Sequence, residues 1–342
     1  MNPGMPDERS GPGPRVQWGM VIHGGVGVLP RHELTPDLEA AYLETLRASL
    51  SEGYAAMRRG GTAVDGVVEA IRVMEDSVLF NAGRGSNLTT DGVVSMDASI
   101  MVGDTLEAGA VAGVGDVRNP IVLARHVMED CPHVMLAGRG AEAFARESGL
   151  EAEDPGYFFT QRRWDELQAA KAREAEGEAR PNTVDMDHVQ ALAAGAEPPT
   201  EEDLRHRSGT VGAVALDQGG RLAAGTSTGG SANNKWGRIG DSPVVGAGTY
   251  AGSHCGVSCT GWGEYFIRHA VAHDIQARMS YLGLSLRDAA HEVVMEKLEE
   301  HRKGLGGVVA MDRDGHVEMC FNTRGMYRGW VDQAGRVVVA IF

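Results

Sequence analysis

The stretch from Ser208 to Ala215 (SGTVGAVA) constrains the fold of this chain more than any other. It passes directly from a small polar turn into a hydrophobic strand, and Thr210 follows Gly209 at the point where the turn ends. Glycine has no Cβ, so it allows backbone geometries that are strained for other residues. A loosely patterned, charged segment comes before this stretch, and a run dense in Gly and Thr comes after it. We therefore predict that the chain is cut between Gly209 and Thr210.

The chemistry of an N-terminal threonine supports this prediction. A threonine hydroxyl is a weak nucleophile until a base takes its proton, and an N-terminal threonine carries that base as its own α-amino group. The unperturbed pKa of an α-amine is about 7.7–8.0, which suits a general base near neutral pH. Taken alone, the stretch fits an ordinary strand threonine better, because β-branched residues are common in strands. The rest of the chain decides for cleavage at Thr210.

Composition limits the class of protein. The 342 residues are 42% hydrophobic and 23% charged, enough for one large or two ordinary domains. The net charge of −15 argues against nucleic acid or an anionic membrane as a partner. No apolar run approaches the ~20 residues of a membrane span. Residues 1–17 are rich in Pro, Gly and charge, which indicates a flexible tail and not a signal peptide. Four cysteines without CxxC spacing favour free thiols in the cytoplasm.

The first half of the chain alternates helix and strand signals. Thr35-Pro36 and Thr62 are helix starts, the second with capping-box spacing to Asp65. The expected elements are a strand at Val16–Gly25, helices at Thr35–Arg59 and Thr62–Glu75, a strand at Val93–Val102, a helix capped by Asn119 and ending near Asp130, and a helix at 139–148. Residues 151–207 are charged with little apolar face, and we expect a solvated helix followed by a mobile linker.

The second half reads as hairpins and helices. Two hairpins are expected around Asp217–Gly220 and Asp312–Gly315, and helices at Gly263–Ser280 and Ser285–His301. Such an order favours layers of helices on antiparallel sheets.

Two other catalytic patterns are weaker. Gly225–Gly229 (GTSTG) matches the G-x-S-x-G elbow of serine hydrolases, but the elbow needs a helix to follow and Gly230-Ser231-Ala232 does not start one. The hairpin instead returns Thr228 to the side of Thr210. His269 and His273 share a face of one expected helix, but without the glutamate of an HExxH zinc site.

Two further groups suit an amino-acid substrate. Arg238 and Asp241 lie three residues apart in a turn, where they form either a surface ion pair of little energetic value or a clamp. As a clamp, the guanidinium would take an α-carboxylate and the carboxylate an α-ammonium group. Thr260-Gly261, just before a helix, offers a hydroxyl and an N–H donor for an oxyanion hole, and Thr260 also fits a helix N-cap.

Taken together and in order, these motifs resemble the isoaspartyl peptidase/L-asparaginase family, the plant-type asparaginases among the N-terminal-nucleophile hydrolases. The resemblance runs from about Trp18 to about Trp330 through IHGGVG, FNAGRG, DASIM, GTVGAVALD, TSTGG, GRIGDSP, SCTG and FNTRGMYR. It implies an α+β fold, an αββα sandwich of two antiparallel sheets between helical layers. It also implies cleavage into an α subunit of residues 18–209, including the linker, and a β subunit of residues 210–342. The two subunits would form one domain, and two such units a dimer.

The resemblance also implies roles for single residues. Thr210 matches the nucleophile, Thr228 the threonine bonded to it, and Asn81 an asparagine near its amino group. Thr260 and Gly261 match the oxyanion hole, and Arg238, Asp241 and Gly263 the substrate pocket. No cofactor is required. A loop that wraps a structural sodium ion in several members corresponds here to the backbone carbonyls of Met74, Glu75, Ser77, Phe80, Ala82 and Arg84.

The implied reaction is acyl transfer from a β-aspartyl dipeptide or L-asparagine to Thr210, followed by hydrolysis that releases aspartate. The alternatives are an amidase of the glycosylasparaginase type, whose nucleophile stretch tends to read DTIGM, and an uncleaved, non-catalytic homologue. The chain departs from the family pattern at Ala232, Trp236, Trp262 and Arg324. Of these, Trp262 is placed to narrow the pocket and change the preferred leaving group.

Overall fold

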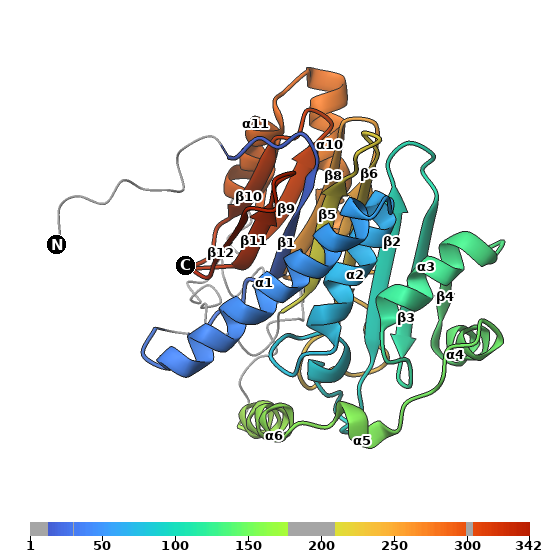
Figure 1. Cartoon of the computed structure of the whole chain (residues 1–342). Helices are drawn as coiled ribbons and strands as arrows, with labels where there is room; N and C mark the ends of the chain where they lie inside the picture. The colour runs from blue at the N-terminus through green and yellow to red at the C-terminus, as the bar shows by residue number, and fades with distance from the viewer. Residues whose placement is uncertain (1–12, 30, 177–208, 299–303) are drawn as a thin grey trace.

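The computed structural model describes residues 13–29, 31–176, 209–298 and 304–342. Two β-sheets pack face to face between two layers of helices (Figure 1). The elements before the predicted cleavage point are β1 (Gly19–Gly25), α1 (Pro36–Arg58), α2 (Ala63–Glu75), the 3₁₀ turn η1 (Gly83–Gly85), β2 (Met96–Val102), β3 (Ala108–Val114), α3 (Pro120–Asp130), β4 (Met135–Ala137), α4 (Gly138–Glu147), α5 (Pro155–Phe158) and α6 (Gln161–Ala175). Those after it are β5 (Val211–Leu216), β6 (Leu222–Thr228), β7 (Thr249–Ala251), β8 (Cys255–Gly261), α9 (Gly263–His269), α10 (Val271–Leu282), α11 (Leu286–His291), the π-helix η2 (Glu292–Lys297), β9 (Gly306–Asp312), β10 (Val317–Phe321), β11 (Tyr327–Val331) and β12 (Val337–Ala340).

The larger sheet has the strand order β12-β11-β1-β5-β6-β2-β3-β4, and the smaller one β10-β9-β8-β7. Helices α1, α2 and α3 cover the outer face of the larger sheet, and α10 and α11 cover that of the smaller (Figure 1). The predicted αββα sandwich is confirmed. The strand pairs are antiparallel, as expected, except that the edge strand β4 runs parallel to β3.

The central strand β5 is buried on both faces. Ala213 and Ala215 belong to the core under the α-helices, whereas Val214 and Leu216 belong to the core between the sheets. Strands covered on both sides read as continuous hydrophobic runs, which explains the composition of Val211–Leu216. Because β5 lies in the middle of the larger sheet, Thr210 stands at the end of a central strand, and it is buried.

Helix starts were predicted well where a side chain caps the helix. Thr35 accepts a hydrogen bond from Leu38 N, and Thr62 with Asp65 forms a complete capping box. Asn119 occupies the N-cap position of α3 and the helix ends at Asp130, as predicted, but the Asn119 side chain donates to Asp76 and makes no capping bond, so the side-chain cap was wrong.

The single helix expected at Gly263–Ser280 is two helices. Ala270 adopts a left-handed conformation (φ 46°) between α9 and α10. His269 and His273 therefore lie on different helices, and His273 packs edge-on against Tyr250. The second expected helix, Ser285–His301, begins as predicted but continues as the π-helix η2, and residues 299–303 lie outside the described residues.

Two segments are more ordered than expected. In the expected tail, residues 1–12 lie outside the described residues, but Val16 is buried and its N–H donates to Gly315 O. In the expected linker, residues 177–208 also lie outside them, whereas α6 packs onto the domain with Leu167 fully buried. The sequence of α6 does not predict this packing, because its buried residues are one leucine and one arginine among many charged side chains.

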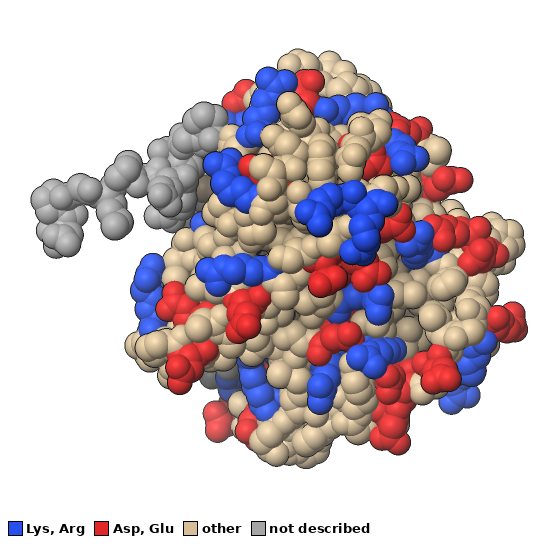
Figure 2. All heavy atoms as spheres, in the orientation of Figure 1, with Lys and Arg blue, Asp and Glu red and all other residues tan. Residues whose placement is uncertain are grey.

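Acidic and basic side chains alternate over the face drawn in Figure 2, where they form no single basic surface among the described residues. No helix within the described part of the chain is long and apolar enough to cross a membrane.

Candidate active site

Thr210 and Thr228 meet at the ends of two paired strands. Val211 of β5 pairs with Ser227 of β6, which places Thr228 beside Thr210. The Thr210 hydroxyl donates to Thr228 Oγ1 at 3.3 Å. The two side chains are only 6% and 4% exposed, so this hydroxyl pair is shielded from bulk water.

Two donors converge on the carbonyl oxygen of Gly209, which belongs to the peptide bond before Thr210. Asn81 Nδ2 lies 2.7 Å from it and Thr228 Oγ1 lies 3.1 Å from it. The amide of Asn81 is itself held, because its Nδ2 also donates to Gly230 O and its Oδ1 accepts from Asn87 N. Fixed donors on a carbonyl oxygen stabilise the negative charge that develops when the carbon is attacked.

Glycine is required at this bond for steric reasons. A Cβ on Gly209 would lie 2.9 Å from Asn81 Cβ. A Cβ on Gly25, at the end of β1, would lie 3.0 Å from Gly209 Cα and 3.1 Å from Thr210 N. The backbone of the HGG sequence therefore packs directly against the peptide bond that joins Gly209 to Thr210.

His23 was not assigned a role from the sequence, although it stands in the quoted HGG motif. Its Nδ1 lies 3.0 Å from the Thr210 carbonyl oxygen and its Nε2 lies 2.9 Å from Ser258 Oγ. A carbonyl can only accept, so Nδ1 carries the proton and Nε2 accepts from Ser258. Burial lowers the pKa of His23 to about 3, against the opposing hydrogen bond to Thr210. A neutral imidazole thus holds the main chain of Thr210 in place.

Thr260 and Gly261, the predicted oxyanion pair, lie at the end of β8. Thr260 Oγ1 accepts a hydrogen bond from Val26 N at 3.3 Å, and Val26 follows the Gly25 that packs on Thr210. Thr260 is not a helix cap: Trp262 occupies the N-cap position of α9 and makes no side-chain cap. Trp262 is buried and packs edge-on against Tyr265.

Arg238, Asp241 and Gly263 come together as predicted. A Cβ on Gly263 would meet Arg238 Nη2 and Asp241 Oδ1, each at 2.9 Å. Sequence reasoning missed Glu264, which accepts from Arg238 Nε at 2.9 Å and from Nη2 at 3.1 Å. The sequence offered one indication of this role, because Glu264 directly follows Gly263, a predicted pocket residue. Glu264 thus occupies one edge of the guanidinium, and the Nη1–Nη2 edge is the one left to bind a second carboxylate.

Asp241 is poised to receive a cation. Its Oδ2 is buried and has no hydrogen-bond partner among the described residues. Burial raises the pKa of Asp241 to about 7, although Arg238 opposes the shift. A buried carboxylate oxygen without a donor is costly, and a substrate ammonium group would supply that donor.

Ser227, the central residue of the G-x-S-x-G match, lies inside strand β6 and not at a turn. It is fully buried and donates to Glu75 Oε1 at 2.6 Å. The serine-hydrolase pattern at this position is therefore structural.

The loop with the predicted sodium ligands is tightly folded around two glycines. A Cβ on Gly85 would lie 2.1 Å from Phe80 O and 2.9 Å from Ser77 O, and one on Gly83 would lie 2.3 Å from Glu75 O. Three of the six named carbonyl oxygens thus lie within 2.9 Å of a position that a side chain on Gly83 or Gly85 would fill. Hard cations prefer oxygen ligands, and backbone carbonyls are among them. The carbonyl of Ala82 also accepts from Gly85 N, and that of Met74 from Ser77 N.

Comparison with known proteins places this chain in a family. A family model described as asparaginase matches residues 16–341. An isoaspartyl peptidase from Escherichia coli (strain K12) is 48% identical over 312 residues, covering 91% of this chain and 92% of the relative. A probable isoaspartyl peptidase/L-asparaginase 2 from Arabidopsis thaliana is 41% identical over 334 residues, covering 95% and 99%. A plant-type L-asparaginase from Pyrococcus abyssi is 42% identical over 309 residues, covering 90% and 94%.

Proposed function

We propose, from the premise that this chain belongs to the asparaginase family, that it cuts itself before Thr210 and then uses Thr210 to hydrolyse β-aspartyl bonds. It is a hydrolase of the isoaspartyl peptidase/L-asparaginase type. Its substrates are small molecules that carry an aspartyl group: β-aspartyl dipeptides and L-asparagine.

The single observation that carries the self-cleavage is the pair of donors on the Gly209 carbonyl. The Thr210 hydroxyl attacks the Gly209 carbonyl carbon, and Asn81 with Thr228 stabilises the oxygen anion. The C–N bond breaks, the hydroxyl proton ends on nitrogen, and Gly209 is left as an ester of the Thr210 oxygen. Water hydrolyses the ester, which yields a carboxylate at Gly209 and a free amine and hydroxyl at Thr210.

The same threonine then serves in turnover. The substrate α-carboxylate binds the Nη1–Nη2 edge of Arg238, and its ammonium group donates to Asp241 Oδ2. The side-chain carbonyl is attacked by Thr210, with Thr260 and Gly261 as oxyanion donors. Ammonia or an amine leaves with a proton, and water releases aspartate from the β-aspartyl ester. Asp241 Oδ2, which has no hydrogen-bond partner among the described residues, supports this assignment, because a substrate ammonium group would supply the missing donor.

The test is the mass of the purified chain after incubation at neutral pH. Cleavage yields fragments of 209 and 133 residues (342 − 209), the smaller beginning at Thr210, and Thr210→Ala stays in one piece. The cleaved chain is then given a β-aspartyl dipeptide, L-asparagine and a glycosylasparagine. Hydrolysis of the first two supports the proposal. Hydrolysis of the third alone would establish the glycosylasparaginase alternative, and an intact, inactive chain would establish a non-catalytic homologue.

We also propose a structural sodium ion in the 74–84 loop, supported by the carbonyls of Glu75, Ser77 and Phe80 that crowd Gly83 and Gly85. When bound, it would brace the turn that carries Asn81. No step of the reaction passes through it.

A dimer of cleaved units and a cytoplasmic location complete the proposal. Tyr281 and Leu282, at the end of α10, are 78% and 66% exposed, which suits an apolar contact between units. A molar mass of twice 36.3 kDa by light scattering would support the dimer, and a monomer mass would refute it.

The four cysteines are free thiols, which suits a reducing compartment. Recovery of the protein outside the cytoplasmic fraction would refute the location.

A further inference from the structure

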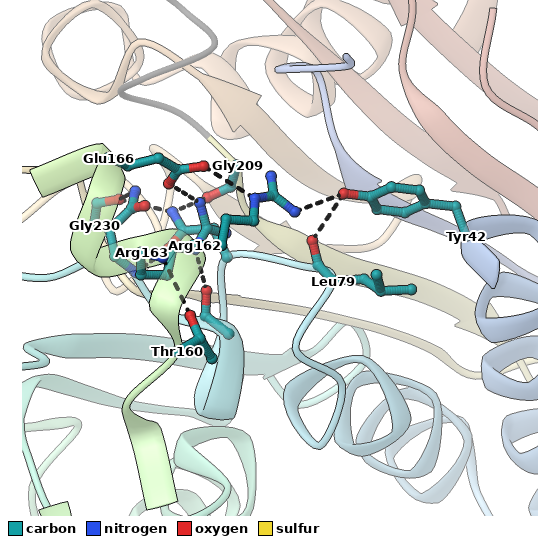
Figure 3. Close-up of polar contacts among 11 residues, drawn as sticks. Tyr42, Leu79, Thr160, Arg162, Arg163, Glu166, Gly209 and Gly230 are labelled. Carbon is teal, nitrogen blue, oxygen red and sulfur yellow. Dashed lines mark hydrogen bonds and ion pairs between the residues drawn. The ribbon is translucent and has the colours of Figure 1, made fainter. Parts of the chain in front are cut away.

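Helix α6 reaches the loop that carries Asn81 through a buried arginine. Arg163 donates from Nε to Gly85 O at 2.7 Å. It also donates from Nη1 to Glu166 Oε2 at 2.7 Å (Figure 3). Gly85 belongs to the same tight turn as Asn81, since its N–H donates to Ala82 O. Burial opposes ionisation of Glu166, but Arg163 and Arg162 hold its pKa below the usual value, so the carboxylate stays charged.

A second contact ties the same end of α6 to the start of that loop. Arg162 reaches away from Arg163 toward Tyr42 (Figure 3), and its Nη1 donates to the Tyr42 hydroxyl at 3.0 Å. The Tyr42 hydroxyl donates in turn to Leu79 O at 3.2 Å. Leu79 and Gly85 bracket Asn81, so α6 holds the loop on both sides of this residue.

The other end of α6 contacts the loop that carries Arg238. Glu174 accepts from Lys235 Nζ with both oxygens at 2.8 Å, and from Asn233 Nδ2 at 2.9 Å. Lys235 is hydrogen-bonded to Arg238, the residue proposed to bind the substrate α-carboxylate, because Arg238 N donates to Lys235 O at 3.1 Å.

This second loop has a strained backbone at Trp236. Asn233 and Trp236 both adopt a left-handed conformation with φ of 58°. That conformation is unfavourable for a bulky side chain such as tryptophan and persists only when the surroundings hold it. Glu174 supplies such support from outside the loop.

Arg163 and Glu174 lie eleven residues apart on α6, which corresponds to about 16 Å along a helix. Leu167, between them, is fully buried and fixes the helix on the core. The predicted cut at Gly209 would leave α6 on one fragment and the 233–238 loop on the other. The Glu174 contact would then join the two fragments beside the substrate pocket.

We propose that α6 is a positioning element for both halves of the site. Glu174 acts through Lys235 and Asn233 to set Arg238 for the substrate α-carboxylate, and Arg163 acts through Gly85 to set Asn81 on the Gly209 carbonyl. The two ends have separate consequences: one governs substrate binding and the other governs cleavage. This inference rests on the proposed function, because it assigns α6 to the residues of that reaction.

The test for the first end is Glu174→Gln, compared with Glu176→Gln, a substitution of the exposed C-cap residue of the same helix. In the cleaved enzyme, Glu174→Gln should raise KM for L-asparagine and for a β-aspartyl dipeptide about tenfold, equivalent to about 1.4 kcal/mol of lost binding. Its kcat and the extent of cleavage should stay within about twofold of wild type, because Thr210 and Asn81 are untouched. The swapped pair Glu174→Lys with Lys235→Glu should restore KM.

The test for the second end is Arg163→Met, for which self-cleavage should slow about tenfold or more, since misplacing one oxyanion donor costs up to 10²–10³ in rate. Thermal unfolding of both variants in a Thr210→Ala background separates positioning from loss of fold. The inference is overturned if Glu174→Gln has the KM of wild type. It is also overturned if kcat falls by as much as KM rises and the swapped pair does not restore them. Either result leaves the proposed function intact. An inactive wild-type chain overturns both.

Discussion

Asn81 donates a hydrogen bond of 2.7 Å to the carbonyl oxygen of Gly209, although 128 residues separate them in the sequence. The same amide is locked by Gly230 O and Asn87 N. The donor is therefore in place before any bond is made or broken, as electrostatic stabilisation of an oxyanion requires.

We expect Asn81→Ala to slow self-cleavage by about 10²–10³, the usual loss for one oxyanion donor. The measurement is the fraction of intact chain over time by mass spectrometry. Ser77→Ala is the matched control, because among the described residues its hydroxyl accepts only from Leu79 N in the same loop. Equal cleavage rates in Asn81→Ala and wild type would show that this contact is incidental.

Thr228 serves both Thr210 and the Gly209 carbonyl through one oxygen atom. Thr228→Val keeps the shape of the side chain and removes the hydroxyl, so cleavage should fall by about 10² or more. Thr228→Ser restores the hydroxyl and should recover most of the rate. If Thr228→Val cleaves at the wild-type rate and Thr228→Ser does not, the methyl group and not the hydroxyl is what the site uses.

The affinity for L-aspartate should depend on pH through Asp241. Its pKa lies at about 7, raised from 3.8 mainly by burial, so the carboxyl takes up a proton as the pH falls below 7. Only the charged form pairs with a ligand ammonium group. The dissociation constant should therefore rise about tenfold per pH unit below pH 7. Calorimetry between pH 5 and 8 measures it, and Asp241→Asn should bind weakly with no such slope.

Glu75 should make the fold less stable as the pH rises. Burial raises its pKa from 4.5 to about 8, against hydrogen bonds from Ser227, Ile121 and Asn119. Between these two values the folded chain binds more protons than the unfolded chain. The free energy of unfolding then falls with rising pH across this window, by up to about 1.4 kcal/mol per pH unit, and levels off above pH 8.

The measurement is urea unfolding from pH 5 to 9 in a Thr210→Ala background, which keeps the chain in one piece. Glu75→Gln mimics the neutral carboxyl and should remove this part of the slope. Glu44→Gln on the exposed face of α1 should leave it unchanged. A slope that survives in Glu75→Gln would assign the effect to other buried carboxyls, such as Asp97, whose pKa burial raises to about 6.

Replacing sodium should lower the melting temperature if the carbonyls near Gly83 and Gly85 hold this ion. At a sodium concentration ten times its dissociation constant, the expected stabilisation is about 1.4 kcal/mol. Thermal unfolding of the Thr210→Ala chain in sodium chloride is compared with choline chloride at equal ionic strength. Identical melting temperatures would remove sodium from the proposal.

The layered fold and most residues of the candidate site could be predicted from the order of residues alone. Capping threonines set the starts of α1 and α2, and two-sided burial made β5 a continuous apolar run. These are local signals, because each cap or strand pattern depends on residues close in the chain. The groups around Thr210 were predictable because they stand in motifs with distinctive spacing.

The side chains that support those groups could be identified only in the folded chain. His23 contacts Thr210 across 187 residues, and Glu264 takes one edge of Arg238 across 26. Helix α6 was expected to be solvated because its sequence is highly charged, whereas Arg163 is buried and paired with Glu166. Whether a charge faces water or a partner depends on what the rest of the chain brings beside it, and composition within one segment carries no record of that.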